Sequence, residues 1–189
     1  MCFVTSNMGK YKEASSILSD FRIRMKTIEL REIQSVQVRE VVSEKAKEAY
    51  RKLRRPLFVE DTGLYIDAMN GFPGALAKPL IESVGTAGVC RMVDSFGRRS
   101  AYAETCIGYA DGRGVKVFSG KVGGRIAGRP RGDNGFGWDP VFVPDGHAQT
   151  FAQMPMTEKN RISHRAMAFR AFGAYMSRRR SAIREYDLH

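Results

Sequence analysis

Two adjacent carboxylates, Glu60 and Asp61, follow an apolar run at residues 57–59 and precede Thr62 and Gly63. Acidic side chains beside a buried strand cost free energy unless a cation or a basic group pairs with them. Mg²⁺ prefers one or two carboxylates, completed by water and substrate phosphates. Because neighbouring strand residues point to opposite faces, only one of the pair needs to enter a cleft. The pair predicts a magnesium site, with a salt-bridged, partly exposed strand end as the alternative.

A second polar cluster lies near the amino terminus, between an expected strand at residues 1–6 and an expected helix at residues 10–21. The cluster consists of Thr5, Ser6, Asn7, Gly9 and Lys10. Free N–H groups at a helix N-terminus attract phosphate, and a lysine adds a point charge. The GxxxxGK[ST] spacing of a P-loop is absent. The cluster predicts a phosphate-binding turn, with an ordinary Ser/Asn helix cap as the alternative.

Two further clusters could hold a nucleobase. The first is a glycine-rich basic loop containing Phe136, Gly137, Trp138 and Asp139. Aromatic faces in such a loop can stack on a base, although they more often cover the edge of a core. In the second, Ser163 is a good N-cap that places His164 and Arg165 in the first turn of a helix, where the dipole disfavours cations. These two side chains could donate to the 6-oxo group of a purine, and an exposed basic cap is the alternative.

Apolar periodicity predicts the elements that position these clusters. Strands are expected at residues 1–6, 23–30, 57–59, 100–110, 115–126 and 141–143, and helices at 10–21, 38–53, 75–93 and 164–183. The third helix should be interrupted around residues 85–88, and Asp111-Gly112 predicts a hairpin between the two long strands. Three βα units followed by a β-rich part and a final helix predict an α/β fold, with a mixed, twisted sheet flanked by helices.

The length of 189 residues suits one domain, or one domain with two lobes. The 3 cysteines, Cys2, Cys90 and Cys106, form no CxxC pair, so we expect reduced thiols and no zinc site. The apolar run at the amino terminus is too short for a secretory leader, and no stretch approaches a membrane span. These features predict a cytoplasmic protein without a membrane partner.

The formal net charge is +11, from 31 Lys and Arg against 20 Asp and Glu, which favours polyanionic partners. Two basic groups stand out: Arg51, Lys52, Arg54 and Arg55 at a helix end, and Arg178, Arg179, Arg180 and Arg184 near the carboxyl terminus. Because the helix dipole favours cations at C-termini, we expect solvated helix ends there. A nucleic-acid-binding module is the alternative, but the chain carries no helix-turn-helix, zinc-finger or RNA-recognition signature. Nucleic acid is therefore not an expected partner.

Together the polar clusters resemble the inosine triphosphate pyrophosphatase family, which includes the dITP/XTP pyrophosphatases. The matching segments occur in the family's order and span nearly the whole chain. They are Thr5-Ser6-Asn7-x-Gly9-Lys10-x-x-Glu13, Leu30-x-Glu32-Ile33-Gln34, Glu44-Lys45-Ala46, Val59-Glu60-Asp61-Thr62-Gly63-Leu64, Gly71-Phe72-Pro73-Gly74, Gly135-Phe136-Gly137-Trp138-Asp139-Pro140, Phe151-Ala152-Gln153-Met154 and Glu158-Lys159-Asn160-x-x-Ser163-His164-Arg165. At residues 75–79 the chain departs from the aromatic and small polar residues that the family often has there, which affects the dimer contact or the cleft rim.

The resemblance implies a homodimer in which residues 1–189 form a single two-lobed domain with a central active-site cleft. It implies Mg²⁺-dependent hydrolysis of ITP, dITP and XTP to the nucleoside monophosphate and pyrophosphate, which cleanses the nucleotide pool. Asp61 would be the catalytic carboxylate and would bind the metal together with Glu32. The implied substrate-binding residues are Thr5, Ser6, Asn7, Gly9, Lys10, Glu13, Lys45, Thr62, Phe136, Gly137, Trp138, Asp139, Lys159, His164 and Arg165.

In that family pattern Lys10 and Lys45 would contact phosphates and Phe136 would stack on the purine. Asp61, or a neighbouring acid such as Glu13, would orient or deprotonate the attacking water. Fixed donors at the purine 6-position accept a 6-oxo group and leave adenine badly paired, a discrimination that can reach about 10⁴-fold. Guanine shares the 6-oxo group, so its rejection must come from the 2-amino side. A triphosphatase that prefers pyrimidines is the alternative, and the two base-binding clusters argue against it.

Overall fold

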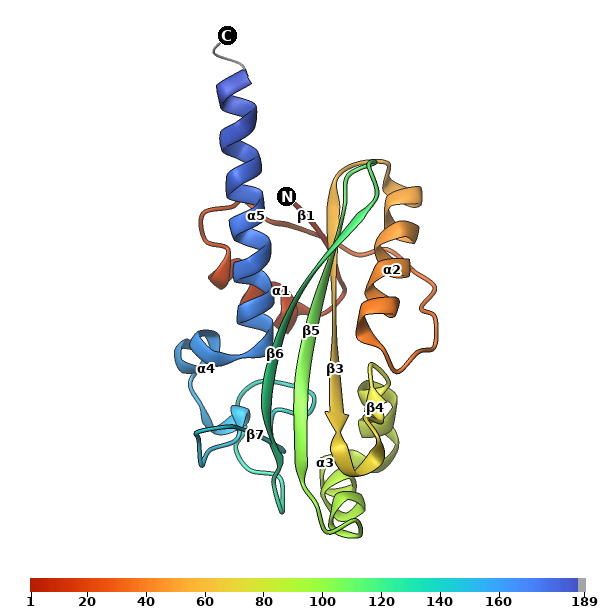
Figure 1. The fold of residues 1–189 in the computed structure, drawn as a ribbon, viewed down its shortest axis with the longest axis vertical. Helices are drawn as coiled ribbons and strands as arrows, with labels where there is room; N and C mark the ends of the chain where they lie inside the picture. Colours follow the sequence, from red (N-terminus) through yellow and green to blue (C-terminus); the bar gives the residue numbers. More distant parts are fainter. Residues whose placement is uncertain (187–189) are drawn as a thin grey trace.

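The structure, a computed structural model, describes residues 1–186, with side chains described up to residue 180. A 7-stranded sheet runs along the molecule in the order β2-β1-β3-β5-β6-β7, and β4 pairs with β3 off this path (Figure 1). The strands are β1 (Cys2–Val4), β2 (Arg24–Lys26), β3 (Leu57–Ile66), β4 (Pro73–Gly74), β5 (Ser100–Ala110), β6 (Val115–Ile126) and β7 (Phe142–Pro144). Strand β1 is parallel to β2 and β3, and the other pairings are antiparallel. The predicted mixed sheet is confirmed.

Helices cover both faces of this sheet. Helix α2 (Val38–Leu53) packs on one face of β3 and β5, and α5 (His164–Tyr186) packs on the opposite face of β5 and β6 (Figure 1). Side chains alternate along β3 accordingly, since Val59 packs in the cluster with α2 whereas Phe58 packs in the cluster with α5. The other helices are α1 (Met8–Ile17), α3 (Ala77–Asp94) and α4 (Met156–Ile162), with 3₁₀ turns at Asp67–Met69 and Phe151–Gln153.

An aromatic cluster holds α5 against the sheet. The rings of Phe3 and Phe58 stack with centroids 4.5 Å apart, and Phe169 and Phe172 of α5 pack against them. All four side chains are fully buried. Burial of an aromatic side chain of this size contributes about 1.5–3 kcal/mol, so the cluster fixes the helix whose first turn carries His164 and Arg165.

The two long strands β5 and β6 have the predicted ends, whereas the shorter strands differ. Strand β2 covers only Arg24–Lys26 instead of residues 23–30, since the alternation of Ile23 and Met25 breaks at Thr27 and Ile28 and the chain then leaves the sheet. Strand β1 is shorter than residues 1–6, and β7 begins one residue later than expected.

Strand β3 does not end at Val59 but continues to Ile66, so Glu60 and Asp61 lie in its middle. Its whole length pairs with β5 on one side. On its other side, β1 pairs at Leu57 and Phe58 and β4 pairs at Leu64 and Tyr65. Residues 59–63 therefore have one unpaired edge, in the gap between β1 and β4. This gap lies beyond the carboxyl end of β1, and open α/β sheets bind ligands beside the carboxyl ends of their strands.

The helices also differ from the prediction at their ends. Helix α1 spans Met8–Ile17 rather than residues 10–21, because Asn7 already caps it. Helix α3 has the expected interruption, at Gly85 with φ 69°. Helix α4 was not predicted, since its 7 residues are too few to show a helical period. Helix α5 begins at His164 as predicted, and Ser163 Oγ accepts from the Ala166 N–H at 3.2 Å.

Cys2, Cys90 and Cys106 are all free. None of the helices in the described part of the chain combines the length and the apolar character that crossing a membrane requires. Arg184 and the rest of the predicted basic tail beyond residue 180 lie outside the described side chains.

Candidate active site

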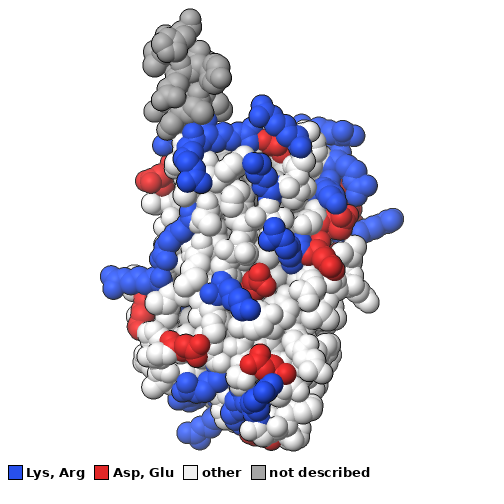
Figure 2. Space-filling model, viewed as in Figure 1, with Lys and Arg blue, Asp and Glu red and all other residues white. Residues whose placement is uncertain are grey.

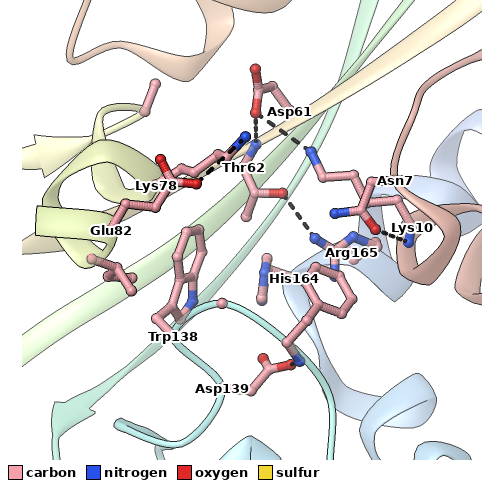
Figure 3. A pocket seen from close by; sticks show the side chains of 14 residues that line it. Asn7, Lys10, Asp61, Thr62, Lys78, Glu82, Trp138, Asp139, His164 and Arg165 are labelled. Carbon is pink, nitrogen blue, oxygen red and sulfur yellow. Dashed lines mark hydrogen bonds and ion pairs between the residues drawn. The ribbon is translucent and has the colours of Figure 1, made fainter. Parts of the chain in front are cut away.

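Two adjoining cavities open along the unpaired edge of β3. The Trp138 cavity, of about 310 Å³, is lined by Thr62, Trp138, His164 and Arg165 among others (Figure 3). The Lys45 cavity, of about 560 Å³, is lined by Thr5, Ser6, Glu32 and Lys45 among others. Both cavities share Asn7, Lys10, Asp61, Ala75 and Lys78. They form one cleft with Asp61 at its middle, so the structure brings both ends of the predicted site together.

The loop that leads from β1 into α1 forms one wall of this cleft. Asn7 Oδ1 accepts from the Lys10 N–H at 3.0 Å and thereby caps α1, while Thr5 Oγ1 accepts from the Asn7 N–H at 3.1 Å. Gly9 and Lys10 of the predicted phosphate-binding turn lie in the first turn of α1, which begins at Met8. The first turn of α1 contains no acidic residue, so its N–H groups and the Lys10 ammonium present positive potential to the cleft.

Packing against Phe136, rather than backbone conformation, explains the glycine at position 9. The backbone there needs no left-handed conformation, and Gly9 lines neither cavity. A Cβ on Gly9 would instead lie 2.9 Å from Cδ1 of Phe136. The missing side chain therefore lets the ring of Phe136 approach α1.

Asp61 occupies the centre of the cleft between two lysines. Its Oδ1 lies 3.6 Å from Lys10 Nζ and its Oδ2 lies 3.4 Å from Lys45 Nζ. Asp61 Oδ1 also accepts from the Thr62 N–H at 2.8 Å, and Lys10 Nζ donates to the Glu60 carbonyl at 3.4 Å. These contacts satisfy polar groups of the free strand edge and leave the Asp61 carboxylate, 17% exposed, facing the cavities.

The two carboxylates of the Glu60–Asp61 pair point to opposite faces, as predicted. The Glu60 side chain is fully buried, and its Oε2 lies 2.9 Å from Lys10 Nζ. Burial opposes ionisation of Glu60, but the charges of Lys10 and Arg165 more than offset it and lower the pKa of that carboxyl to about 2. Glu60 is therefore a permanent anion that orients two cations.

A cation already bridges the two residues predicted to hold a metal. Lys45 Nζ contacts Glu32 Oε1 and also Asp61 Oδ2, so both carboxylates converge on one point. Burial would lower the pKa of Lys45, but Asp61 and Glu32 outweigh it and raise that pKa. Two carboxylates beside open cavity space fit Mg²⁺, which takes its remaining ligands from water and phosphate. Within the described residues no group of three or more His, Cys, Asp or Glu is close enough to complete a site from the protein alone.

A buried ion network supports the opposite end of the cleft. Lys159 Nζ lies 2.9 Å from Glu13 Oε1 and 2.7 Å from Asp139 Oδ2. Arg165 donates to Glu13 at 2.8 Å, to Glu60 at 3.3 Å and to Thr62 Oγ1 at 3.1 Å. Burial opposes the charge on Glu13, but Arg165 and Lys159 outweigh it and its pKa is lowered. Removal of one partner from such a network leaves a buried charge uncompensated, at a cost of about 3–5 kcal/mol.

The network places two of the expected substrate-binding residues away from the cleft. Glu13 and Lys159 are 2% and 3% exposed and line neither cavity. Glu13 therefore cannot act on an attacking water in this arrangement, because both of its oxygens are engaged by Lys159 and Arg165. Their role is to position other side chains, since Glu13 holds Arg165 and Lys159 holds Asp139.

The carboxylate of Asp139 shapes the Phe136–Asp139 loop by accepting a hydrogen bond from the loop backbone. Asp139 Oδ2 accepts from the Phe136 N–H at 2.8 Å, and a Cβ on Gly135, which has φ 76°, would lie 2.1 Å from that oxygen. The Phe136 ring packs against Arg165, with 4.9 Å from the guanidinium carbon to the ring centroid. Trp138 and His164 lie nearly parallel with centroids 6.4 Å apart, and Figure 3 shows both beside the same space.

His164 is a neutral, partly unsatisfied group in the wall of the Trp138 cavity. Burial, followed by the positive charges of Arg165 and Lys159, lowers its pKa well below 6.5. Its Nδ1 is buried and has no hydrogen-bond partner in the described part of the chain. A buried polar atom without a partner is costly, and a ligand in the cavity could satisfy it.

The other expected residues all line the cleft. They are Thr5, Ser6, Asn7, Lys10, Glu32, Lys45, Asp61, Thr62, Phe136, Gly137, Trp138, Asp139, His164 and Arg165. Sequence reasoning missed Lys78, which lines both cavities, and Glu82, whose Oε1 lies 3.8 Å from Lys78 Nζ. A signal was available, because Lys78 follows Gly74 closely in the segment that departs from the family pattern.

The fold and the cleft together define an α/β protein with one long mixed sheet, a basic and acidic floor at the free edge of β3, and an aromatic pocket beside it. The chain belongs to the Ham1 family, whose sequence profile matches residues 1–175.

Similar sequences and structures support this membership. The chain is 40% identical over 168 residues to a dITP/XTP pyrophosphatase of Hyperthermus butylicus, covering 88% of each chain. It is 43% identical over 169 residues to an inosine triphosphate pyrophosphatase of Schizosaccharomyces pombe, covering 88% of this chain and 89% of that one. Among solved structures, a HAM1 protein from Coxiella burnetii superposes with a TM-score of 0.83 at 27% identity, covering 94% of this chain and 98% of the other.

Proposed function

We propose that this protein is a Mg²⁺-dependent nucleoside triphosphate pyrophosphatase that hydrolyses ITP, dITP and XTP to the monophosphate and pyrophosphate. The observation that carries the proposal is the cleft itself. An Asp61 carboxylate held between Lys10 and Lys45 adjoins an aromatic pocket that ends in the buried donors of Arg165. The names of relatives about 40% identical point to the same reaction.

At the phosphate end, the chemistry is positioning and neutralisation of charge. Water attacks the α-phosphorus, the bond from that phosphorus to the bridging oxygen breaks, and its electron pair leaves with pyrophosphate. Asp61 orients the water and accepts its proton, which its exposure to both cavities allows. Lys10 and Lys45 neutralise charge on the phosphates and on the leaving group.

Glu32 and Asp61 are the residues that would hold Mg²⁺. The metal supplies Lewis-acid polarisation of phosphate oxygens when it is bound. Lys45 contacts both carboxylates and would then be released towards the phosphates. The exposed Glu32 side chain, 54% accessible, can adjust its position for this exchange.

At the base end, the chain selects by hydrogen bonding. The Arg165 guanidinium has five N–H donors. Its contacts with Glu13, Glu60 and Thr62 use three of them. Its remaining donors, with a ring nitrogen of His164, can meet the 6-oxo group of hypoxanthine or xanthine. Adenine carries a donor at that position, so it would leave these groups unpaired, a discrimination that can reach about 10⁴-fold.

The proposal is tested by product analysis. The purified protein is incubated with ITP and, separately, with ATP, each with and without Mg²⁺. We expect IMP and pyrophosphate from ITP, formed only with Mg²⁺ and far faster than AMP from ATP. Formation of IDP and phosphate would show that water attacks the γ-phosphorus instead. Equal rates for ITP and ATP would contradict the proposed base selection.

The proposal extends to the cellular setting. We propose that a single two-lobed domain over residues 1–189 works in the cytoplasm as a homodimer and cleanses the nucleotide pool. Three exposed apolar side chains, Phe72, Val84 and Phe96, belong to the region of β4 and α3 and suit a subunit contact. Sedimentation equilibrium tests the dimer, and a monomer at micromolar concentration would contradict it.

A further inference from the structure

The cleft uses little of the chain's positive charge, and much of the rest gathers at the end of the molecule where β3 begins. Four segments, at residues 20–24, 48–55, 111–116 and 175–180, carry Arg22, Arg24, Arg51, Lys52, Arg54, Arg55, Arg113, Lys116, Arg178, Arg179 and Arg180. Only Asp20, Glu48 and Asp111 are acidic in the same segments. We call the surface formed by these cations the basic pole. Figure 2 shows lysine and arginine side chains concentrated at this upper end.

Contacts between distant segments make the pole one continuous surface. Arg179 of α5 forms an ion pair with Asp111 at the tip of the β5–β6 hairpin. The Tyr50 hydroxyl of α2 lies 2.5 Å from the place that a Cβ on Gly112 would occupy, so the same tip touches the end of α2. Nearby, Arg55 Nη2 lies 3.8 Å from Cys2 Sγ in β1.

Helix ends explain only part of this concentration. Arg51 and Lys52 lie in the last turn of α2, where the dipole favours cations. Arg113 lies in a hairpin turn, however, and Arg24 is in a strand. Among the described residues, Lys52 and Arg179 are the two cations of the pole with a carboxylate partner. The other positive charges repel one another, so a polyanion would bind there favourably.

The chemistry of the pole suits phosphate rather than a lipid interior. Most of its cations are arginines, whose planar fork matches phosphate oxygens in a bidentate way. None of the large apolar side chains that are exposed in the described part of the chain belongs to the pole. A surface of this kind lacks the apolar anchor that interfacial membrane binding uses. Two aromatic rings of the pole segments are already paired with its cations, since Lys116 Nζ lies 5.0 Å from the centroid of Tyr175 and the guanidinium carbon of Arg180 lies 5.5 Å from that of Phe21.

We propose that the basic pole binds the phosphate backbone of nucleic acid, without base specificity. The missing recognition motifs led to the expectation of no nucleic-acid partner, but such motifs read bases, and contacts to phosphates alone do not require them. The pole is separate from the cleft, because Leu57, at the start of β3, and Asp61 are four residues apart, about 13 Å along a strand. Nucleic acid can therefore bind without entering the cleft.

The test uses the full chain and a 25-base-pair duplex DNA of mixed sequence, labelled with fluorescein, in anisotropy titrations from 50 to 200 mM KCl. The pole variant carries Arg55→Glu, Arg113→Glu and Arg178→Glu. Its control carries Arg91→Glu, Arg98→Glu and Arg125→Glu, which changes the net charge equally at exposed positions outside the pole. Circular dichroism melting of each variant verifies that it folds.

We expect the wild type to bind with a strongly salt-dependent Kd, because each phosphate contact contributes about 0.9 to the slope of log K against log salt. The pole variant should bind at least tenfold more weakly with a smaller slope, and the control should stay within threefold of wild type. Equal weakening by both variants, or no binding by the wild type at 50 mM KCl, would overturn the proposal. Pole-dependent binding to vesicles with 30% phosphatidylserine, but not to DNA, would reassign the surface to membranes.

Discussion

The two ends of the cleft hold their charges in opposite ways. At the base end, Lys159 and Arg165 are each 3% exposed, and every one of their carboxylate partners is buried. At the phosphate end, the side chains of Glu32 and Lys78 are 54% and 82% exposed. The same types of residue are therefore fixed at one end and free to rearrange at the other.

This difference matches the tasks of the two ends. A buried network keeps its donors in place, because moving one charge leaves another uncompensated. Fixed donors can reject a base that does not match them. The phosphate end must exchange partners instead, since Lys45 contacts the same two carboxylates that fit Mg²⁺. Rigidity would thus provide selection, and exposure would provide the rearrangement that chemistry needs.

The largest effect is expected from Asp61→Asn. The change keeps the size of the side chain and removes the acceptor for the proton of the attacking water. We expect turnover of ITP to fall by about 10²- to 10⁴-fold, the usual contribution of a general base. Melting temperature and steady-state rates are measured together. Retention of most activity with an unchanged fold would defeat the assignment of Asp61.

Arg165→Ala tests how much the buried ion network at the base end contributes to the stability of the fold. The change leaves Glu13 and Glu60 without one of their cations, so we expect a loss of about 3–5 kcal/mol in the free energy of unfolding. The Michaelis constant for ITP should rise as well. Arg161→Ala is the matched control, since this arginine is exposed, and it should change stability by less than about 0.5 kcal/mol. Equal stability losses in urea unfolding would contradict a special role for the network.

Glu32→Gln tests the adaptable end. The side chain is exposed, so we expect stability to change by less than about 0.5 kcal/mol. Loss of a residue that only supports a metal ligand typically weakens metal binding by about 10- to 100-fold. Loss of Glu32 as a ligand should therefore raise the Mg²⁺ concentration for half-maximal activity by at least that factor. A magnesium titration of the initial rate gives the answer, and an unchanged requirement would exclude Glu32 as a ligand.

The last effect is a pH dependence that separates two groups of the base end. His164 has a folded pKa well below 6.5. As the pH falls below about 6.5, His164 takes up a proton in the unfolded chain but not in the folded one. The free energy of unfolding therefore decreases as the pH falls. Glu60, with a folded pKa of about 2, contributes stability that is present above about pH 4.5 and is lost between there and pH 2.

Urea unfolding from pH 8 to pH 3 should thus show two steps of decreasing stability. The variant His164→Gln should lose the first step and keep the second. Persistence of the first step in that variant would assign it to another group.

Sequence and structure agree where the determining contacts are local. Strands β5 and β6 follow from alternation and from the Asp111-Gly112 turn, and both have the predicted ends. Ser163 caps α5 through a partner only three residues away. Such signals lie within a few residues and can be read directly.

The misreadings share a dependence on distant contacts. Polar residues usually mark a strand end, which is why the sequence predicts one at Glu60 and Asp61, whereas Lys10 and Arg165 satisfy their charges in the middle of β3. The pairing of Glu13 with Lys159 spans 146 residues and leaves no local pattern. The unpaired edge of β3 depends on where β1 and β4 end, which composition and periodicity do not encode.

The most direct measurement is hydrolysis of ITP in water enriched in ¹⁸O, followed by mass spectrometry of both products. Attack on the α-phosphorus beside Asp61 would place the label in IMP and leave the pyrophosphate unlabelled. Label in the pyrophosphate would mean attack on the β-phosphorus and would contradict the proposed alignment of the triphosphate in the cleft.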